Sequence, residues 1–300
     1  MRFRSDNPKN IPSMRSLLRS GRLAWSLAGA ICCASPAIAT PILGPDLASF
    51  AVLGASGVTN VPVSIIGGNL GSAPNASVGG GYIFTSGSLQ ANTATAQQAQ
   101  LDLDAAIITL SAFGVGTTVT GGNFDAWQAL HGGVFLPGTY TIPAALVNLT
   151  GNLILDGGGN NNAVWVFQFP STLITSTTSN VLVQNVGNGA NVGVYWNVHS
   201  AATINGTTFA GNVLAHDLIS SDGNLTMNCG RLLSATTQVT LIQDSISITG
   251  CNGSSGGFDQ GVDIGSGGTG GSNGHVVPEP STLAILGFGL ALLGVVRRRV

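Results

Sequence analysis

The sequence predicts a mainly β protein, and three observations favour a β-solenoid. Short apolar segments recur about every 8 to 12 residues from Phe169 onward, separated by Gly, Asn, Asp and Ser. This spacing is typical of sandwiches, barrels and solenoids. The segments are only about three to five residues long, Gly occurs 44 times, and charged residues make up 7% of the chain. A thin core and tight corners use such small, uncharged residues, so the solenoid is the preferred architecture among the three.

The first 39 residues are predicted to be a secretory signal peptide. A basic region ends at Arg22, an apolar stretch covers 23–38, and Ala37-Ile38-Ala39 offers a small-x-small cleavage site. The apolar run is too short for a membrane anchor and is interrupted by Pro36. We therefore expect an exported chain that begins near residue 40.

The charge of the remaining body restricts its partners. Between residues 40 and 274 there is one cation, Arg231, and there are ten acids, all Asp, which gives a net charge of −9. A body without a basic patch cannot neutralise phosphates, so no nucleic-acid partner is expected.

One segment, 88–112, departs from the strand pattern and is predicted to be an α-helix. It contains no Gly or Pro, Ser88 is a suitable N-cap, and Gly114 is a suitable stop. Its apolar face is narrow and rich in Ala: Ala96, Ala99, Leu103, Ala106, Ile107 and Leu110. A membrane-surface helix would carry cations opposite this face, and this one has only Asp102 and Asp104. We expect the helix to pack against the β body.

Two cysteines, Cys229 and Cys251, remain after removal of the signal peptide. In an exported protein the simplest outcome is a single disulfide between them. A zinc site would need nearby His or Cys partners, and none is suitably spaced. No metal and no cofactor are predicted.

The C-terminal part is predicted to be a tether followed by a sorting signal. Residues 253–276 are a Gly/Ser-rich linker, although Gly256-Gly257-Phe258-Asp259 is faintly similar to calcium-binding repeats. Within 277–300, Pro278-Glu279-Pro280 precedes an apolar run over 283–296, and Arg297, Arg298 and Arg299 end it. Fourteen residues span about 21 Å as a helix, which is short for a permanent membrane anchor.

This order of motif, apolar helix and Arg cluster resembles the PEP-CTERM sorting signal. The resemblance implies transient membrane association through the C-terminal helix and processing by an exosortase. It also implies delivery to the surface or the exterior of a Gram-negative cell.

Several segments of the body, in their order, resemble the β-solenoid domain of microbial ice-binding proteins. They include Ile66-Gly67-Gly68-Asn69-Leu70-Gly71, Leu136-Pro137-Gly138-Thr139-Tyr140 and Phe209-Ala210-Gly211-Asn212-Val213. The resemblance implies that residues 40–252 form an irregular right-handed β-solenoid of triangular cross-section, with the long helix packed along its side.

The same resemblance implies adsorption to ice through a flat face rich in Thr, Ser and Asn, as in antifreeze proteins that inhibit ice recrystallisation. A rigid row of hydroxyl and methyl groups holds water molecules near lattice spacing. The candidate residues are Thr175, Thr177, Ser179, Thr203, Asn205, Thr207, Asn224 and Thr226. The chain departs from the family pattern at Asp222-Gly223-Asn224-Leu225-Thr226, where Asp222 brings a charge. A flat face free of charge would favour ice, and a charge on every face would favour adhesion.

The alternative is a cell-surface or exopolysaccharide-matrix structural protein or adhesin with the same fold. The sorting signal and the tether motivate it, with matrix polysaccharide as the partner. Enzymatic activity is not expected, because the Asp residues are scattered and the body has no Glu. His131, His199, His216 and His275 lack metal-ligand spacing, and His216-Asp217 is interpreted as a solvated corner.

Overall fold

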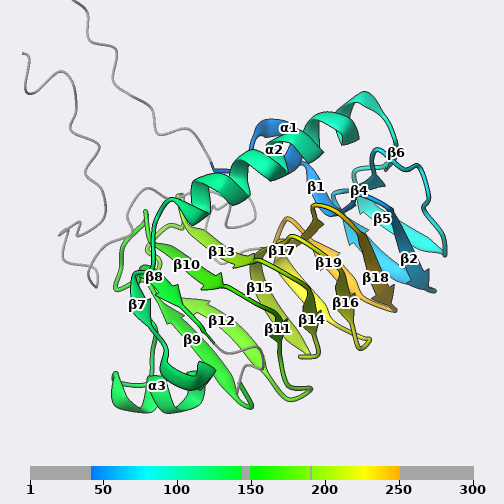
Figure 1. The fold of residues 1–300 in the computed structure, drawn as a ribbon. Coiled ribbons are helices and arrows are strands. Elements are labelled where there is room, and N and C mark those ends of the chain that lie inside the picture. Colours follow the sequence, from blue (N-terminus) through cyan, green and yellow to red (C-terminus); the bar gives the residue numbers. More distant parts are fainter. Residues whose placement is uncertain (1–41, 144–148, 190, 251–300) are drawn as a thin grey trace, which may run out of the picture. The chain divides into compact units, whose positions relative to one another are not determined.

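Parallel strands dominate the computed structural model, which describes residues 42–143, 149–189 and 191–250 (Figure 1). Every strand pair among these residues is parallel. One sheet has 14 strands and a second has five. Successive turns of chain each add a strand to each face, so the predicted solenoid is confirmed. The described residues belong to the unit Ala37–Val300, and the unit Met1–Pro36 lies outside them.

The first of three faces, the helix-covered face, lies beneath the long helix. Its strands are β8 (Gly138–Thr141), β10 (Val164–Phe169), β13 (Gly193–Val198), the C-terminal halves of β15 (Thr208–Ala215) and β17 (Thr226–Ser234), β1 (Phe50–Gly54), β4 (Asn69–Ser72) and β6 (Leu89–Ala91). A two-residue strand, β7 (Thr117–Thr118), pairs with β8 at one end.

The second face, the five-stranded face, is a separate sheet. It consists, in spatial order, of β11 (Leu173–Ile174), β14 (Ala202–Ile204), β16 (Ile219–Ser221), β18 (Gln238–Ile242) and β2 (Gly57–Val61). The third, the amide face, contains β9 (Asn152–Asp156), β12 (Asn180–Gln184), the N-terminal halves of β15 and β17, β19 (Ser245–Ser247), β3 (Ser64–Gly67) and β5 (Tyr82–Ser86).

A glycine allows β15 to pass from the amide face to the helix-covered face. The strand register shifts between Phe209 and Gly211, where the chain turns the corner. Gly211 has φ +97°, and a Cβ there would lie 2.5 Å from Val194 Cγ1 and 2.9 Å from Trp196 Nε1. Only glycine combines this backbone conformation with so close an approach.

The stacking order of the coils does not follow the sequence. The N-terminal strands β1, β2 and β3 stack directly on β17, β18 and β19, so the N-terminal coil continues the solenoid beyond the C-terminal one. Helix α2 (Ala94–Ser111) then returns the chain from β6 to β7 at the opposite end (Figure 1). Its 18 residues span about 27 Å, whereas eight strands side by side span about 34 Å.

Helix α2 begins later than predicted. Thr93 is the N-cap, and its side chain accepts a hydrogen bond from the Ala96 backbone N–H. Residues Leu89–Ala91 instead form β6, because pairing with β4 satisfies their backbone groups. The predicted packing is confirmed, since Ala96, Ala99, Leu103, Ala106 and Leu110 are buried; Ile107 is only half-buried. Among the described residues, no helix has both the length and the apolarity to cross a membrane.

Three short helical segments complete the fold: α1 (Pro45–Ala48) beside α2, the 3₁₀ turn η1 (Thr120–Gly122), and α3 (Phe124–Leu130) at the β7 end.

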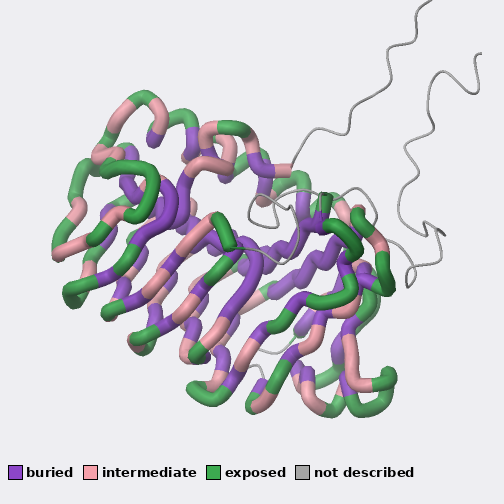
Figure 2. The backbone as a smooth tube through the Cα atoms, turned by 180° about the vertical axis from the view of Figure 1, so that it is seen from behind, coloured by how far each residue is buried: buried purple, intermediate pink, exposed green. Residues whose placement is uncertain are grey.

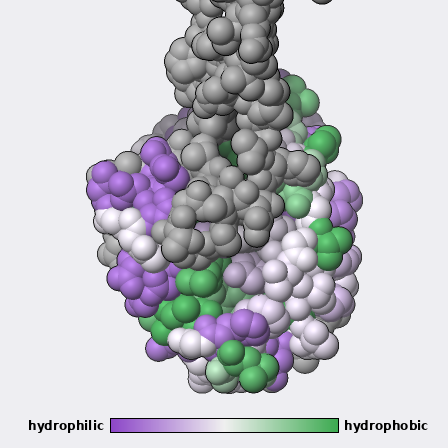
Figure 3. All heavy atoms as spheres, turned by 90° about the vertical axis from the view of Figure 1, so that its left-hand side faces the viewer, coloured by the Kyte–Doolittle hydropathy of each residue, from purple (hydrophilic) through white to green (hydrophobic). Residues whose placement is uncertain are grey.

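Within the core, aromatic rings form a continuous row along the solenoid. The ring centroids of Phe167 and Trp196 are 4.3 Å apart, and those of Trp196 and Phe209 are 4.8 Å apart. Figure 2 shows that strand interiors are largely buried while the corners carry most of the exposed residues. The α3 end has a mixed polar and apolar surface (Figure 3).

Candidate functional site

A row of outward side chains crosses the five-stranded face in register. Strand pairing aligns Ile174, Thr203, Ser220, Thr240 and Thr59, one residue from each strand. The preceding residue of each strand, from Leu173 to Val58, is fully buried. Because side chains alternate between the two sides of a strand, the aligned residues point to solvent. We call Thr203, Ser220, Thr240 and Thr59 the hydroxyl row.

Hydrogen bonds fix the hydroxyl row in pairs. The hydroxyl oxygens of Thr59 and Thr240 are 3.0 Å apart, and those of Thr203 and Ser220 are 3.2 Å apart. A hydroxyl offers one donor and two acceptor positions, so each oxygen keeps capacity for water. Neighbouring strands lie about 4.8 Å apart. The row therefore presents two hydrogen-bonded pairs of hydroxyl groups on a sheet whose strands are regularly spaced.

The strands of the five-stranded face carry no charged residue. The carboxylates nearest to them in sequence are at the corners, where Asp217 precedes β16, Asp222 follows it, and the buried Asp244 follows β18. Asp222 is thus at the rim of this face, next to the corner with the amide face, and not within the hydroxyl row. The strands of one face of the solenoid are thus free of charged residues.

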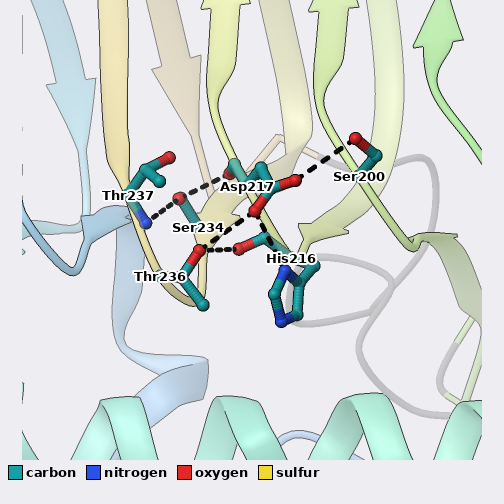
Figure 4. Close-up of polar contacts among 6 residues, drawn as sticks. All are labelled: Ser200, His216, Asp217, Ser234, Thr236 and Thr237. Carbon is teal, nitrogen blue, oxygen red and sulfur yellow. Dashed lines mark hydrogen bonds and ion pairs between the residues drawn. The ribbon is translucent and has the colours of Figure 1, made fainter.

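A polar network stabilises the corner between the helix-covered face and the five-stranded face (Figure 4). Asp217 Oδ1 lies 3.0 Å from His216 Nδ1, and the Ser200 hydroxyl donates to Asp217 Oδ2 at 3.2 Å. The hydrogen bond from His216 is the main cause of the lowered pKa of Asp217. The Ser200 hydroxyl faces the carboxylate and not the imidazole, so Ser200 and His216 do not form a nucleophile–base pair. Both His216 and Asp217 are exposed, in agreement with the predicted solvated corner.

A buried carboxylate, Asp244, stabilises the corner between the five-stranded face and the amide face. Asp244 accepts hydrogen bonds from the Ser221 hydroxyl at 2.5 Å and from the backbone N–H groups of Leu225 and Ile242, both at 3.0 Å. Burial raises the pKa of Asp244, although these hydrogen bonds oppose the rise. Asp244 thereby ties the ends of β16 and β18 to the start of β17.

The structure disperses the Thr, Ser and Asn residues selected from the sequence. Thr203 is in the hydroxyl row and Thr226 is on the amide face. Residues at the turns between these two faces are partly or fully exposed, namely Thr177, Asn205, Thr207 and Asn224.

Thr175 and Ser179 correct the prediction, because they are only 2% and 1% exposed and cannot contact an external surface. Their hydroxyl groups serve the turn, since Thr175 Oγ1 accepts from the Asn205 N–H and Ser179 donates to the Ser176 carbonyl.

Three members of the hydroxyl row, Thr59, Ser220 and Thr240, were not among the predicted candidates. They lie outside the three runs of Thr, Ser and Asn from which the candidates were chosen. Alternation could have identified one of them, since Gln238-Val239-Thr240-Leu241-Ile242 places Thr240 opposite two apolar residues. The partners on other strands could not be found in this way, because the register depends on long-range pairing.

The remaining predicted sites involve residues outside the described part. Cys229 forms a disulfide, and its predicted partner, Cys251, lies outside the described residues. The same applies to Pro278, Glu279, Pro280, Arg297, Arg298 and Arg299, and to His275. Within the described ranges, no three His, Cys, Asp or Glu residues are grouped so that they could hold a metal ion.

Both the β-solenoid body and the C-terminal segment match known protein families. Residues 52–247 match the family model described as ice-binding-like, and residues 276–300 match the PEP-CTERM protein-sorting motif. The chain is 34% identical over 261 residues to an ice-binding protein of Nostoc sp. (strain HG1), covering 84% of this chain and 85% of that protein.

Two solved structures show the same fold. The ice-binding protein of the Antarctic ascomycete Antarctomyces psychrotrophicus is 31% identical with a TM-score of 0.58, covering 71% of this chain and 100% of that one. An ice-binding protein from an Antarctic biological consortium is 30% identical with a TM-score of 0.59, covering 71% and 93%.

Proposed function

The chain belongs to the ice-binding-like family, and from that membership we propose that its five-stranded face adsorbs to ice. The observation that carries the proposal is the hydroxyl row, whose four residues align across four strands of a charge-free sheet. The hydroxyl groups bind water directly, and the threonine methyl groups order the water between them. Water held by hydrogen-bonded hydroxyl pairs on a regularly spaced sheet matches a lattice better than water around mobile charged side chains.

The proposed role is structural recognition without catalysis. The sorting motif indicates export to the cell surface or the exterior, and it implies processing by an exosortase. We propose that residues 1–39 are removed as a signal peptide, that residues 40–252 act as the ice-binding domain, and that residues 253–276 link it to the sorting signal at 277–300. The source would then be a Gram-negative cell, and ice would be met outside it.

Thermal hysteresis and ice recrystallisation of the exported protein test the proposal. Thr240→Tyr places a bulky ring in the hydroxyl row, and Thr226→Tyr places the same ring on the amide face as a matched control. We expect wild type and Thr226→Tyr to be active and Thr240→Tyr to be inactive with an unchanged fold by circular dichroism. Full activity of Thr240→Tyr, or loss only in Thr226→Tyr, would contradict the choice of face.

The amide face favours a second candidate function, retention in an extracellular matrix. Asn152 Oδ1 accepts from Asn180 Nδ2 at 3.2 Å, and Asn180 Oδ1 accepts from the Thr207 hydroxyl at 2.8 Å. Such a ladder of amides and hydroxyls fits the hydroxyl groups of a neutral polysaccharide. Asn180→Lys should then release the protein from the matrix into the medium, and unchanged retention would argue against this role.

A further inference from the structure

Exposed aliphatic side chains gather where β2, β3 and β5 meet, at the corner between the five-stranded face and the amide face. Val61, Val63, Ile65 and Ile83 are 52%, 48%, 42% and 55% exposed. Pro62 between them is also exposed. We call these five residues the aliphatic corner. Clustered exposed apolar side chains of this kind mark an interaction surface in a monomeric protein.

Strand pairing and buried hydrogen bonds support the backbone of the aliphatic corner. Ile65 and Ile83 are direct neighbours across β3 and β5. Beneath them, Ser64 points inward, donating its hydroxyl to Asn60 Oδ1 at 2.8 Å and accepting the Asp244 N–H at 2.9 Å. These hydrogen bonds fix the backbone of the turn between β2 and β3, which carries Val61, Pro62 and Val63.

The aliphatic corner continues the hydroxyl row without a break. Thr59 and Val61 are two residues apart on β2 and are both exposed, while Val58 is buried and the Asn60 side chain donates to the Gly81 carbonyl at 2.6 Å. Thr59 and Val61 therefore point out of the same face. On the neighbouring strand, Ile242 pairs with Val61 just as Thr240 pairs with Thr59.

The chemistry of the aliphatic corner differs from that of a protein interface. Its five residues include no charged, aromatic or Met side chain, whereas protein-binding hot spots rely on Trp, Tyr and Arg anchors. The adjacent Tyr82 and Phe84 do not supply such anchors, because both are partly buried against the core. The corner offers only methyl and methylene groups, next to a row that binds water through hydroxyl groups.

We propose that the aliphatic corner is a second part of the ice-contact surface, which turns from the hydroxyl row onto β3 and β5. This inference rests on the proposed function of the five-stranded face. Water ordered around the methyl groups is held in place by hydrogen bonds to the adjacent Thr59 hydroxyl. Because the corner joins two faces of the solenoid, the protein gains a second orientation on ice and adsorbs to more than one set of crystal planes.

The test compares fluorescently labelled exported proteins on single ice crystals. Val63→Lys combined with Ile83→Lys places charge in the corner without touching the hydroxyl row. Leu101→Lys combined with Ile108→Lys is the matched control on α2, where these side chains are 62% and 70% exposed. We expect the corner variant to lose one set of labelled planes and to need about tenfold more protein for the same hysteresis. The control should match wild type, and Thr240→Tyr should label no plane, because the ring would also cover the neighbouring Thr59 hydroxyl on which both orientations depend.

The outcomes separate the two proposals. If wild type labels ice and the corner variant keeps every plane and full hysteresis, this inference is wrong while the proposed function stands. If wild type is a dimer in solution and the corner variant is a monomer with unchanged ice labelling, the corner is a self-association surface and the inference is also wrong. A wild type that labels no ice overturns the proposed function and the inference together.

Discussion

The hydroxyl oxygens of Thr59 and Thr240 lie 3.0 Å apart although 181 positions separate the two residues in the chain. The contact exists because the N-terminal coil stacks on the C-terminal one, where β2 pairs with β18. It lengthens the hydroxyl row by one strand and joins it to the aliphatic corner. The ice-contact surface we propose therefore depends on the stacking of the N-terminal coil on the C-terminal coil.

Replacing the hydroxyl group of Thr240 by a methyl group should weaken adsorption with little effect on folding. Thr240→Val keeps the shape of the side chain and loses the hydrogen bond to Thr59. An exchange of one hydrogen bond corresponds to about 0.5 to 1 kcal/mol, so activity should fall about two- to fivefold. Thermal hysteresis against protein concentration gives the result. Full activity of Thr240→Val would show that the hydroxyl group has no role.

Removing the charge at the rim of the five-stranded face should improve adsorption. Asp222 is exposed and follows β16 directly, and its carboxylate orients nearby water around a negative charge. Asp222→Asn keeps the size of the side chain. We expect a rise in hysteresis of up to about twofold. Lower activity in this variant would mean that the carboxylate takes part in the contact.

The buried cation should be essential for stability. Arg231 is 1% exposed, its Nε and Nη2 donate to the Ala48 carbonyl at 3.1 and 2.5 Å, and its Nη1 donates to Asn212 Oδ1 at 2.8 Å. Lysine cannot reproduce these contacts, because its single ammonium group lacks the three separate nitrogen donors of the guanidinium group. Arg231→Lys should lower the free energy of unfolding by about 2 to 4 kcal/mol in urea denaturation. A change below about 0.5 kcal/mol would contradict the role given to this side chain.

Acidification should first stabilise the protein and then destabilise it. Burial raises the pKa of Asp244 above its usual 3.8, helped by the negative charge of Asp222. Between pH 3.8 and the raised value the folded state binds more protons than the unfolded state, so the free energy of unfolding increases as the pH falls. The pKa values of Asp156 and Asp217 are lowered, so their stabilising contribution is lost only below 3.8. Tm should therefore pass through a maximum at mildly acidic pH.

The variant Asp244→Asn checks the origin of that maximum. The amide does not titrate, so the rise in Tm on mild acidification should disappear. Three donors converge on the carboxylate, and an amide NH₂ cannot accept from them. The free energy of unfolding at neutral pH should therefore also fall, by about 1 to 3 kcal/mol, and Tm should fall with it. A rise that persists in the variant would assign the effect to other groups.

A methyl group at the bend of β15 should not be tolerated. The positive φ of Gly211 disfavours a side chain, and the nearby Val194 and Trp196 leave no room for one. Gly211→Ala should cost about 3 kcal/mol or more, visible as a lower Tm or as loss of soluble protein. Gly79→Ala is a suitable control because nothing lies within 4 Å of a Cβ there.

The sequence was sufficient for those features that depend on local pattern. The recurrence of short apolar segments indicated the solenoid, and the spacing from Ala96 to Leu110 indicated which side of the helix is buried. The start of the helix was wrong by six residues, because the tertiary pairing of Leu89–Ala91 with β4 overrides their local helix preference.

The position of the candidate site could not be predicted as fully. Thr175 and Ser179 appear in a run rich in Thr and Ser, yet the turn folds them inward to satisfy backbone groups. Thr59 and Thr240 belong to one surface only through the stacking of the first coil on the last, and no local pattern contains that information. Aligning a row across five strands requires the register of every strand.

Partition of the exported protein between slowly grown ice and the remaining liquid tests the central claim most directly. Ordinary solutes are excluded from ice that grows slowly, whereas a protein adsorbed to the growing surface is incorporated. We predict that wild type is enriched in the ice fraction and that Thr240→Tyr stays in the liquid. Exclusion of wild type to the same extent as Thr240→Tyr would contradict adsorption to ice by this chain.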